Sequence, residues 1–150
     1  MNIHTIIVPH DFSEYAEHAF SWAVPLAEQW KAKIIVVHAL PLWHHISLPE
    51  RLFVDLRKAD AAIAAEAEQQ LQGLLAAKRG TTKIEIDTQL LRGAPVEELC
   101  ALAGRQPDAL IVMGSHGRTG VAHAVLGSVA ERVVRYAPCP VLVVRRQEQK

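Results

Sequence analysis

The sequence predicts an α/β fold, with one doubly wound domain over residues 1–150, a five-stranded parallel sheet and helices on both faces. Three observations predict it. Short apolar runs alternate along the chain with longer segments whose apolar residues recur at helical spacing. Most of these runs lack polar alternation, which is typical of parallel strands buried on both faces. The alternation of strand and helix predicts parallel strands joined by right-handed crossovers. No linker or internal repeat divides the chain, which indicates a single domain.

The expected strands are short apolar runs that stop at proline, glycine or polar residues. They lie at residues 5–8, 33–40, 84–90, 109–113 and 141–144. The third run differs from the others because its apolar residues alternate with Glu85, Asp87 and Gln89. Such alternation predicts one solvated face, so we expect this strand at an edge of the sheet.

The expected helices fill the intervals between these strands. They lie at residues 14–31, 51–79, 95–104 and 128–136. Asp11 and Glu14 have the spacing of a capping box, so Asp11 is a candidate cap of the first helix, a role compatible with a place near a ligand. Ser128 and Glu131 repeat that spacing, which predicts that the last helix starts at Ser128. The proline-containing segment 41–50 is expected to form a loop.

The charges of the sequence balance, with 16 Lys and Arg against 16 Asp and Glu. A nucleic-acid-binding protein needs surplus cations to neutralise phosphates, so this balance argues against nucleic acid as a partner. No apolar run approaches the roughly 20 residues that cross a bilayer, which argues against a membrane protein. The amino-terminal residues lack a signal-peptide pattern, and Cys100 and Cys139 form no metal or disulfide motif. A cytoplasmic location is therefore expected.

The carboxyl ends of parallel strands are the expected place for a ligand, and the most unusual segment follows the fourth strand. Gly114, Gly117 and Gly120 lack a Cβ there, so the backbone can approach a ligand closely and adopt positive φ. Ser128 then starts a helix whose first amides carry a partial positive charge. Together these features predict a phosphate site. The alternative is that the glycines form a tight turn and that Ser128 only caps its helix.

Two familiar phosphate loops and a zinc site are not found in the sequence. A Walker A loop ends in Gly-Lys-Ser/Thr, but no lysine occurs between Lys83 and Lys150. A dinucleotide-binding GxGxxG would follow the first strand, where the chain instead has Pro9 and His10. The eight histidines show none of the spacings typical of zinc ligands, so no protein metal site is predicted. His10 could touch a ligand where the strand order reverses, but we expect it to lie on the surface of its loop.

The spacing G-x2-G-x9-G-[ST], formed by Gly114, Gly117, Gly127 and Ser128, resembles the nucleotide-binding branch of the universal stress protein family. The resemblance covers the whole chain. It is carried further by residues 6–14, 111–117 and 137–144. It implies a Rossmann-like fold similar to the adenine nucleotide alpha hydrolases, with strand order 3-2-1-4-5.

The resemblance also implies an ATP or AMP site at the point where the strand order reverses. Asp11 would lie near the ribose or the nucleotide, and the backbone at Ala39 would meet adenine, with Met113 beside it. Gly114 would lie beside the ribose. Arg118 would either reach a γ-phosphate or only solvate its loop. The other implied site residues are Pro9, His116 and, at the phosphates, Gly117, Gly127, Ser128 and Val129.

Proteins that this chain resembles carry Mg²⁺ or Mn²⁺ on the phosphates and commonly dimerise through their last strands, which here span Val141 to Val144. The resemblance therefore implies a homodimeric, nucleotide-dependent regulatory module in a stress response, acting on a protein partner that the sequence does not name. No lysine, and no Gln or Glu in a recognised motif, is placed to assist ATP hydrolysis, so at most slow hydrolysis is expected.

Two other functions stay open. One is a ligand-free stress module that binds proteins, against which the intact glycine spacing argues. The other is an enzyme of a related fold that transfers adenylate or uses a flavin. Adenylate transfer in such enzymes relies on an HxGH motif after the first strand, whereas this chain has Pro9-His10-Asp11-Phe12 there.

Overall fold

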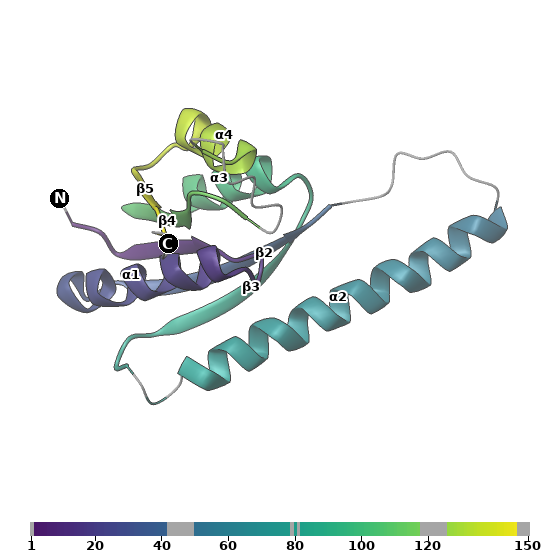
Figure 1. Cartoon of the computed structure of the whole chain (residues 1–150), viewed down its shortest axis with the longest axis horizontal. Coiled ribbons are helices and arrows are strands. Elements are labelled where there is room, and N and C mark those ends of the chain that lie inside the picture. Colours follow the sequence, from purple (N-terminus) through teal and green to yellow (C-terminus); the bar gives the residue numbers. More distant parts are fainter. Residues whose placement is uncertain (1, 42–49, 79, 81, 118–125, 147–150) are drawn as a thin grey trace.

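The computed structural model describes residues 2–41, 50–78, 80, 82–117 and 126–146. Within these residues, five parallel strands form one sheet in the order β3-β2-β1-β4-β5 (Figure 1). The strands are β1 (Thr5–Pro9), β2 (Lys33–Leu40), β3 (Ile86–Arg92), β4 (Ala109–Gly114) and β5 (Val141–Val144). The fold class and the strand order expected from the sequence are confirmed.

The helices of the described residues cover both faces of this sheet (Figure 1). They are α1 (Glu14–Trp30), α2 (Glu50–Lys78), α3 (Pro95–Arg105) and α4 (Ser128–Tyr136). Helices α1 and α2 pack on one face of the sheet, and α3 and α4 pack on the other. None of these helices combines the length and hydropathy that crossing a bilayer requires.

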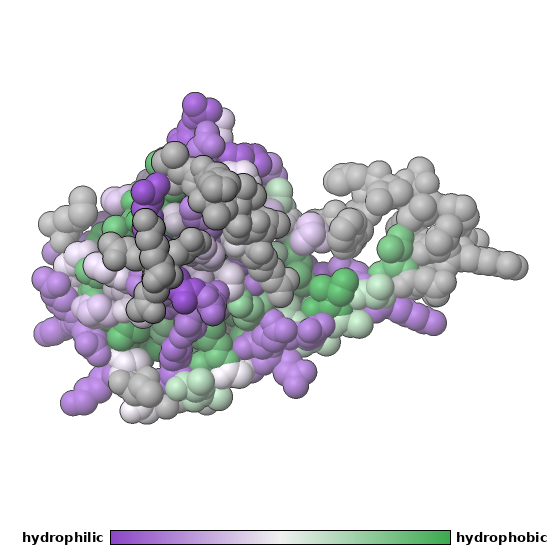
Figure 2. All heavy atoms as spheres, viewed as in Figure 1, coloured by the Kyte–Doolittle hydropathy of each residue, from purple (hydrophilic) through white to green (hydrophobic). Residues whose placement is uncertain are grey.

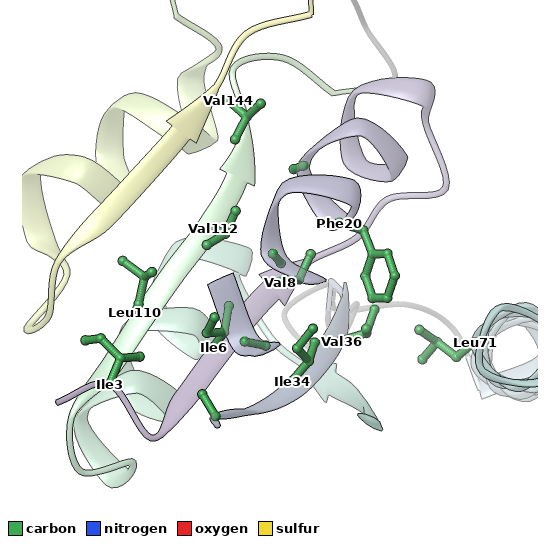
Figure 3. Close-up of a cluster of buried hydrophobic side chains, with 14 residues drawn as sticks. Ile3, Ile6, Val8, Phe20, Ile34, Val36, Leu71, Leu110, Val112 and Val144 are labelled. Atoms are coloured by element: carbon green, nitrogen blue, oxygen red, sulfur yellow. The ribbon is translucent and has the colours of Figure 1, made fainter. Parts of the chain in front are cut away.

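Successive residues of the central strands point to opposite faces, so each strand contributes to two hydrophobic clusters. In β1, Ile6 and Val8 pack with Phe20 of α1, whereas Ile7 packs against α3 and α4. Figure 3 shows the first cluster, with Leu71 of α2 directed toward Phe20 and the sheet. Burial on both faces explains why these strands are continuous apolar runs.

Helix α2 is longer than the strands that it covers, and its amino-terminal half reaches beyond the sheet (Figure 1). The carboxyl-terminal half packs on β2 and β3 through buried residues, which are Ala64, Ala67, Leu71 and Leu75. Arg92 of β3 donates to Asp60 over 2.9 Å. Toward the projecting end, apolar surface is visible in Figure 2, and both Leu56 and Ile63 are exposed.

Helix α4 starts at Ser128, as the sequence predicts, but neither of the two capping boxes that the spacing suggested is formed. Ser13, with extended backbone, is the N-cap of α1, and its hydroxyl accepts from the amide of Ala16. The carboxylate of Asp11 instead accepts from the amide of Ser13. Gly127 is the N-cap of α4, and Ser128 is the first helical residue. An N-cap residue has non-helical backbone angles, and residue spacing does not specify these angles.

The strand expected at residues 84–90 is displaced by two positions, to Ile86–Arg92. The amide of Ile84 donates to the hydroxyl of Thr82 over 3.2 Å and not to a neighbouring strand, which makes a local turn before β3. The alternation of exposed and half-buried residues and the edge position of β3 agree with the sequence prediction. The expected loop at 41–50 lies mostly outside the described residues.

Candidate functional site

A cavity of about 310 Å³ opens at the carboxyl ends of β1, β2 and β4. Strand β1 leads into α1 on one face, and the chain after β4 leads to α4 on the other, so the two connections diverge and leave a crevice between them. Arg118 and Gly120 lie outside the described residues. All the other residues expected at the site line the cavity: Pro9, Asp11, Ala39, Met113, Gly114, His116, Gly117, Gly127, Ser128 and Val129.

One part of the cavity wall is apolar. It comes from β2, from the first turns of α3 and from the end of β4, and its residues are Val37, Ala39, Pro95, Leu99 and Met113. Val37, Leu99 and Met113 are buried, so this wall is already packed from behind. A flat apolar group such as an aromatic base is the kind of ligand that such a wall accepts.

Another part of the wall is the amino terminus of α4, whose first three amides have no acceptor in the described part of the chain. The first intrahelical bond runs from the amide of Glu131 to the carbonyl of Gly127, over 2.9 Å. Within the described residues, the amides of Ser128, Val129 and Ala130 have no acceptor. No side chain caps this helix, so three donors and a partial positive charge face the cavity.

The three glycines of the motif lie close to other parts of the chain, and the contact is tightest against backbone at Gly114. A Cβ on Gly114 would stand 2.9 Å from the carbonyl oxygen of Tyr15, because the first turn of α1 packs against β4 there. A Cβ on Gly127 would stand 3.2 Å from the carbonyl oxygen of Ser115, to which the Gly127 amide donates over 2.8 Å. Neither Gly114 nor Gly117 has a positive φ, so the left-handed backbone that glycine permits is not used at these two positions.

Asp11 and Gly117 lie against each other across the crevice. A Cβ on Gly117 would stand 2.6 Å from Oδ2 of Asp11. The other carboxylate oxygen, Oδ1, accepts from the amide of Ser13 over 3.1 Å and from its hydroxyl over 2.5 Å. The structure therefore brings together the segment after β1 and the segment after β4, which lie about a hundred residues apart in the sequence.

The resemblance noted in the sequence is supported by direct comparison with known proteins. A model of the universal stress protein family matches residues 2–145. The chain belongs to this family. It is 31% identical to the universal stress protein MJ0531 of Methanocaldococcus jannaschii over 149 residues, which are 97% of this chain and 84% of that protein.

Solved structures of the family share the fold. Universal stress protein UspA from Lactobacillus plantarum matches with a TM-score of 0.76 and 30% identity, over 97% of this chain and 99% of that one. A universal stress protein in complex with cAMP matches with a TM-score of 0.68 and 26% identity, over 97% of this chain and 98% of that one.

Two histidines of this family member line the cavity and were not assigned to the site from the sequence. His10 is only 5% exposed, so its expected position on the loop surface is wrong. Its amide donates to the carbonyl of Val37 over 2.8 Å, and its own carbonyl accepts from Nδ1 of His38 over 2.7 Å. His10 continues the alternation of Ile6 and Val8 toward α1, and that alternation is the signal that could have placed it.

His10 is held as a neutral side chain. Burial lowers its pKa, and the nearby Glu17 carboxylate offsets this only in part. Burial acts in the opposite direction on Glu17, but the hydrogen bond and the positive charge of Lys78 hold the pKa of Glu17 below its usual value. Lys78 of α2 thus pairs with Glu17 of α1 next to the end of β1.

The described cavity lining carries one carboxylate, that of Asp11, and neither lysine nor arginine. Within the described part of the chain, no group of three or more His, Cys, Asp or Glu side chains is arranged to hold a metal ion. Backbone amides therefore supply the positive potential of this wall. A ligand with several negative charges would have to bring a counter-ion of its own or use residues beyond the described ones.

Proposed function

We propose that this chain binds an adenine nucleotide, ATP or AMP, in the 310 Å³ cavity and acts as a nucleotide-dependent regulatory module in a stress response. One observation carries the proposal: three amides at the start of α4 lack acceptors and face the same cavity as Asp11. A family member of the same fold has been solved with cAMP, which supports the choice of an adenine nucleotide.

The two ends of the cavity suit different parts of the nucleotide. We assign the phosphates to the amides of Gly117, Ser128 and Val129. Gly127 lines the same part of the cavity, but its amide already donates to Ser115. Adenine fits the apolar wall at Ala39 and Met113. We assign the remaining lining residues, Pro9, Asp11, Gly114 and His116, to the space between adenine and the phosphates.

Asp11 suits the ribose. A carboxylate repels phosphate but accepts hydrogen bonds from hydroxyl groups, and a ribose offers such donors. Oδ1 of Asp11 accepts from Ser13, and Oδ2 lies on the side of Gly117. The carboxylate therefore separates the sugar position from the amides of α4.

Mg²⁺ or Mn²⁺ would enter with the nucleotide, held by phosphate oxygens and water. The lining fits this arrangement because it supplies amides and no cluster of carboxylates within the described residues. The ion would neutralise phosphate charge. The same lining lacks a lysine or arginine to stabilise a phosphoryl-transfer transition state, so we propose binding with at most slow hydrolysis.

We also propose that two copies of the chain pair through β5. This strand is the end of the sheet next to β4, is apolar, and leaves one row of backbone groups unpaired within the described residues. A protein partner would then recognise a homodimer whose subunits each bind nucleotide.

Replacing Ser128 with proline tests the nucleotide assignment. Proline at the first position of a helix removes one amide donor with little strain, and the φ of −69° and ψ of 153° at Gly127 suit a residue before proline. We expect Ser128→Pro to weaken AMP binding by roughly tenfold or more, the scale of one hydrogen bond to a charged group. Ser128→Ala, which keeps the amide, is the matched control and should bind AMP more tightly than Ser128→Pro. Calorimetric titration gives both affinities.

A search for co-purified ligand complements that titration. Denatured protein should release an adenine nucleotide that mass spectrometry identifies. Failure of the wild-type chain to bind ATP, ADP or AMP at low millimolar concentration contradicts the proposal.

A ligand-free protein-binding module is the second candidate. It is favoured by the finding that Gly114, Gly117 and Gly127 all lie close to other parts of the chain, because packing then explains part of the motif without a ligand. The same titration separates the two functions, since a ligand-free module gives no heat with any adenine nucleotide.

A further inference from the structure

The turn that carries Asp11 is stabilised by the ring of His10. The amide of Phe12 donates to Nδ1 of His10 over 3.2 Å. An amide can donate only to a nitrogen that bears no proton, so Nδ1 is the acceptor and the ring proton of neutral His10 is on Nε2. His10 therefore bridges its own strand end to the residue that follows Asp11.

The proton on Nε2 points toward α1. Nε2 lies 3.5 Å from Oε2 of Glu17, and it has no hydrogen-bond partner within the described residues. A carboxylate near Nε2 favours the tautomer with the proton on that nitrogen. Glu17 is itself held by Lys78, whose ammonium also lies 5.1 Å from the centre of the Phe20 ring. Glu17 of α1, held by Lys78 of α2, thus favours the tautomer of His10 with its proton on Nε2.

The turn needs such support because Phe12 has a φ of +64°, a left-handed conformation that is uncommon for an aromatic residue. The Phe12 ring packs between two histidines, with ring centres 5.5 Å from His10 and 4.7 Å from His38. If the hydrogen bond to Nδ1 is lost, the backbone at Phe12 is free to leave this conformation. Asp11, one residue earlier, then loses its position against Gly117.

We propose that His10 is a positioning residue of the nucleotide site: its Nδ1 holds the amide of Phe12 and so fixes the carboxylate of Asp11 in the crevice. The inference rests on the proposed nucleotide function and adds a residue to it. His10 acts through Asp11 and makes no contact with the nucleotide in this role. Glu17 determines which ring nitrogen is available.

The test compares two substitutions of His10. Asparagine places its carbonyl oxygen Oδ1 at the same distance from the main chain as Nδ1 and keeps the acceptor, whereas leucine removes it. We expect His10→Leu to weaken AMP binding by about tenfold, the upper scale of one neutral hydrogen bond, and His10→Asn to recover most of that loss. Urea unfolding of each variant establishes that the titrated protein is folded. Equal affinity in His10→Leu and wild type overturns the inference, as does an equal loss in both variants.

NMR on the nucleotide-free protein gives a readout that does not depend on the ligand. Long-range ¹H–¹⁵N spectra of the wild type should show His10 protonated on Nε2, and the ¹³C signal of the Asp11 carboxylate should shift in His10→Leu but much less in His10→Asn. A proton on Nδ1, or an unchanged Asp11 signal in His10→Leu, overturns the inference. If these spectra agree with it but no nucleotide binds to the wild type, the proposed function fails and the positioning of Asp11 by His10 stands.

Discussion

The carboxylate of Asp11 limits the space for a side chain at Gly117. Its Oδ2 lies 2.6 Å from the ideal position of a Cβ on Gly117. A substitution at Gly117 therefore disturbs Asp11 before it obstructs any ligand. Gly114 behaves in the same way toward the backbone of Tyr15, where no side-chain movement can relieve the collision.

Gly117→Ala is expected to destabilise the protein by about 1 kcal/mol, the lower end of the usual range for overpacking, because the carboxylate of Asp11 can move aside. The same substitution made in an Asp11→Ala background should be nearly neutral, because the colliding carboxylate is gone. Urea denaturation of the wild type, both single variants and the double variant gives the coupling energy. Additive effects of the two substitutions would show that Asp11 is not what excludes a side chain at position 117.

Because His10 is buried, we expect the folded protein to lose stability in mild acid. Burial lowers its pKa in the folded chain, so the unfolded chain takes up this proton first as the pH falls below about 6.5. Protonation then favours the unfolded state. The stability that neutral His10 contributes is complete above pH 6.5 and is lost as the pH falls through the lower pKa of the folded chain. Urea unfolding at pH 7.5 and 5.5 should show a smaller decrease for His10→Asn than for the wild type. An equal decrease would mean that His10 is not the group responsible.

At the scale of elements, β5 has two differently directed rows of backbone groups. The amides of Ile111 and Ser115 donate to the carbonyls of Pro140 and Val144, so the even-numbered residues of β5 face β4. In a strand the odd-numbered residues then direct their amides and carbonyls away from the sheet. Val143 is therefore on the row that a second copy would use.

Val143→Pro is expected to abolish pairing between two copies while leaving the bonds between β4 and β5 intact. Proline removes an amide that points away from β4, and edge strands tolerate it there. Val143→Ala keeps the amide and controls for the loss of packing against α3 and α4. In sedimentation experiments the wild type and Val143→Ala should be dimers and Val143→Pro a monomer. A Val143→Pro dimer would place the interface elsewhere.

For the molecule as a whole, formal charge is zero, and the described cavity lining adds one carboxylate and no lysine or arginine. Affinity should then not increase with the number of phosphates unless a cation accompanies them. In thermal-shift measurements with EDTA, ATP should raise the melting temperature no more than AMP does, and Mg²⁺ should increase the effect of ATP far more than that of AMP. Adenosine serves as the reference without phosphate. Stronger stabilisation by ATP than by AMP in EDTA would locate a neutralising cation among residues beyond those described, such as Arg118.

The sequence predicted the helices and strands to within a few residues because apolar periodicity is a local property. It also placed most of the cavity lining, since residues that follow parallel strands must meet at one edge of the sheet. It failed at the caps of α1 and α4, where Ser13 and Gly127 replace Asp11 and Ser128. Spacing alone cannot distinguish neighbouring polar residues whose backbone angles are decided by the chain on either side.

By itself, the sequence determined the alternation of strands and helices, the family and the strand order that the family implies, and the residues that converge after β1 and β4. Only the tertiary structure showed which atoms lie next to the glycines, that His10 is buried, and that Lys78 of α2 acts on it through Glu17. The physical reason is range: hydrophobic spacing is read from adjacent turns of the chain, whereas a collision, a buried acceptor or an ion pair depends on atoms supplied by distant segments.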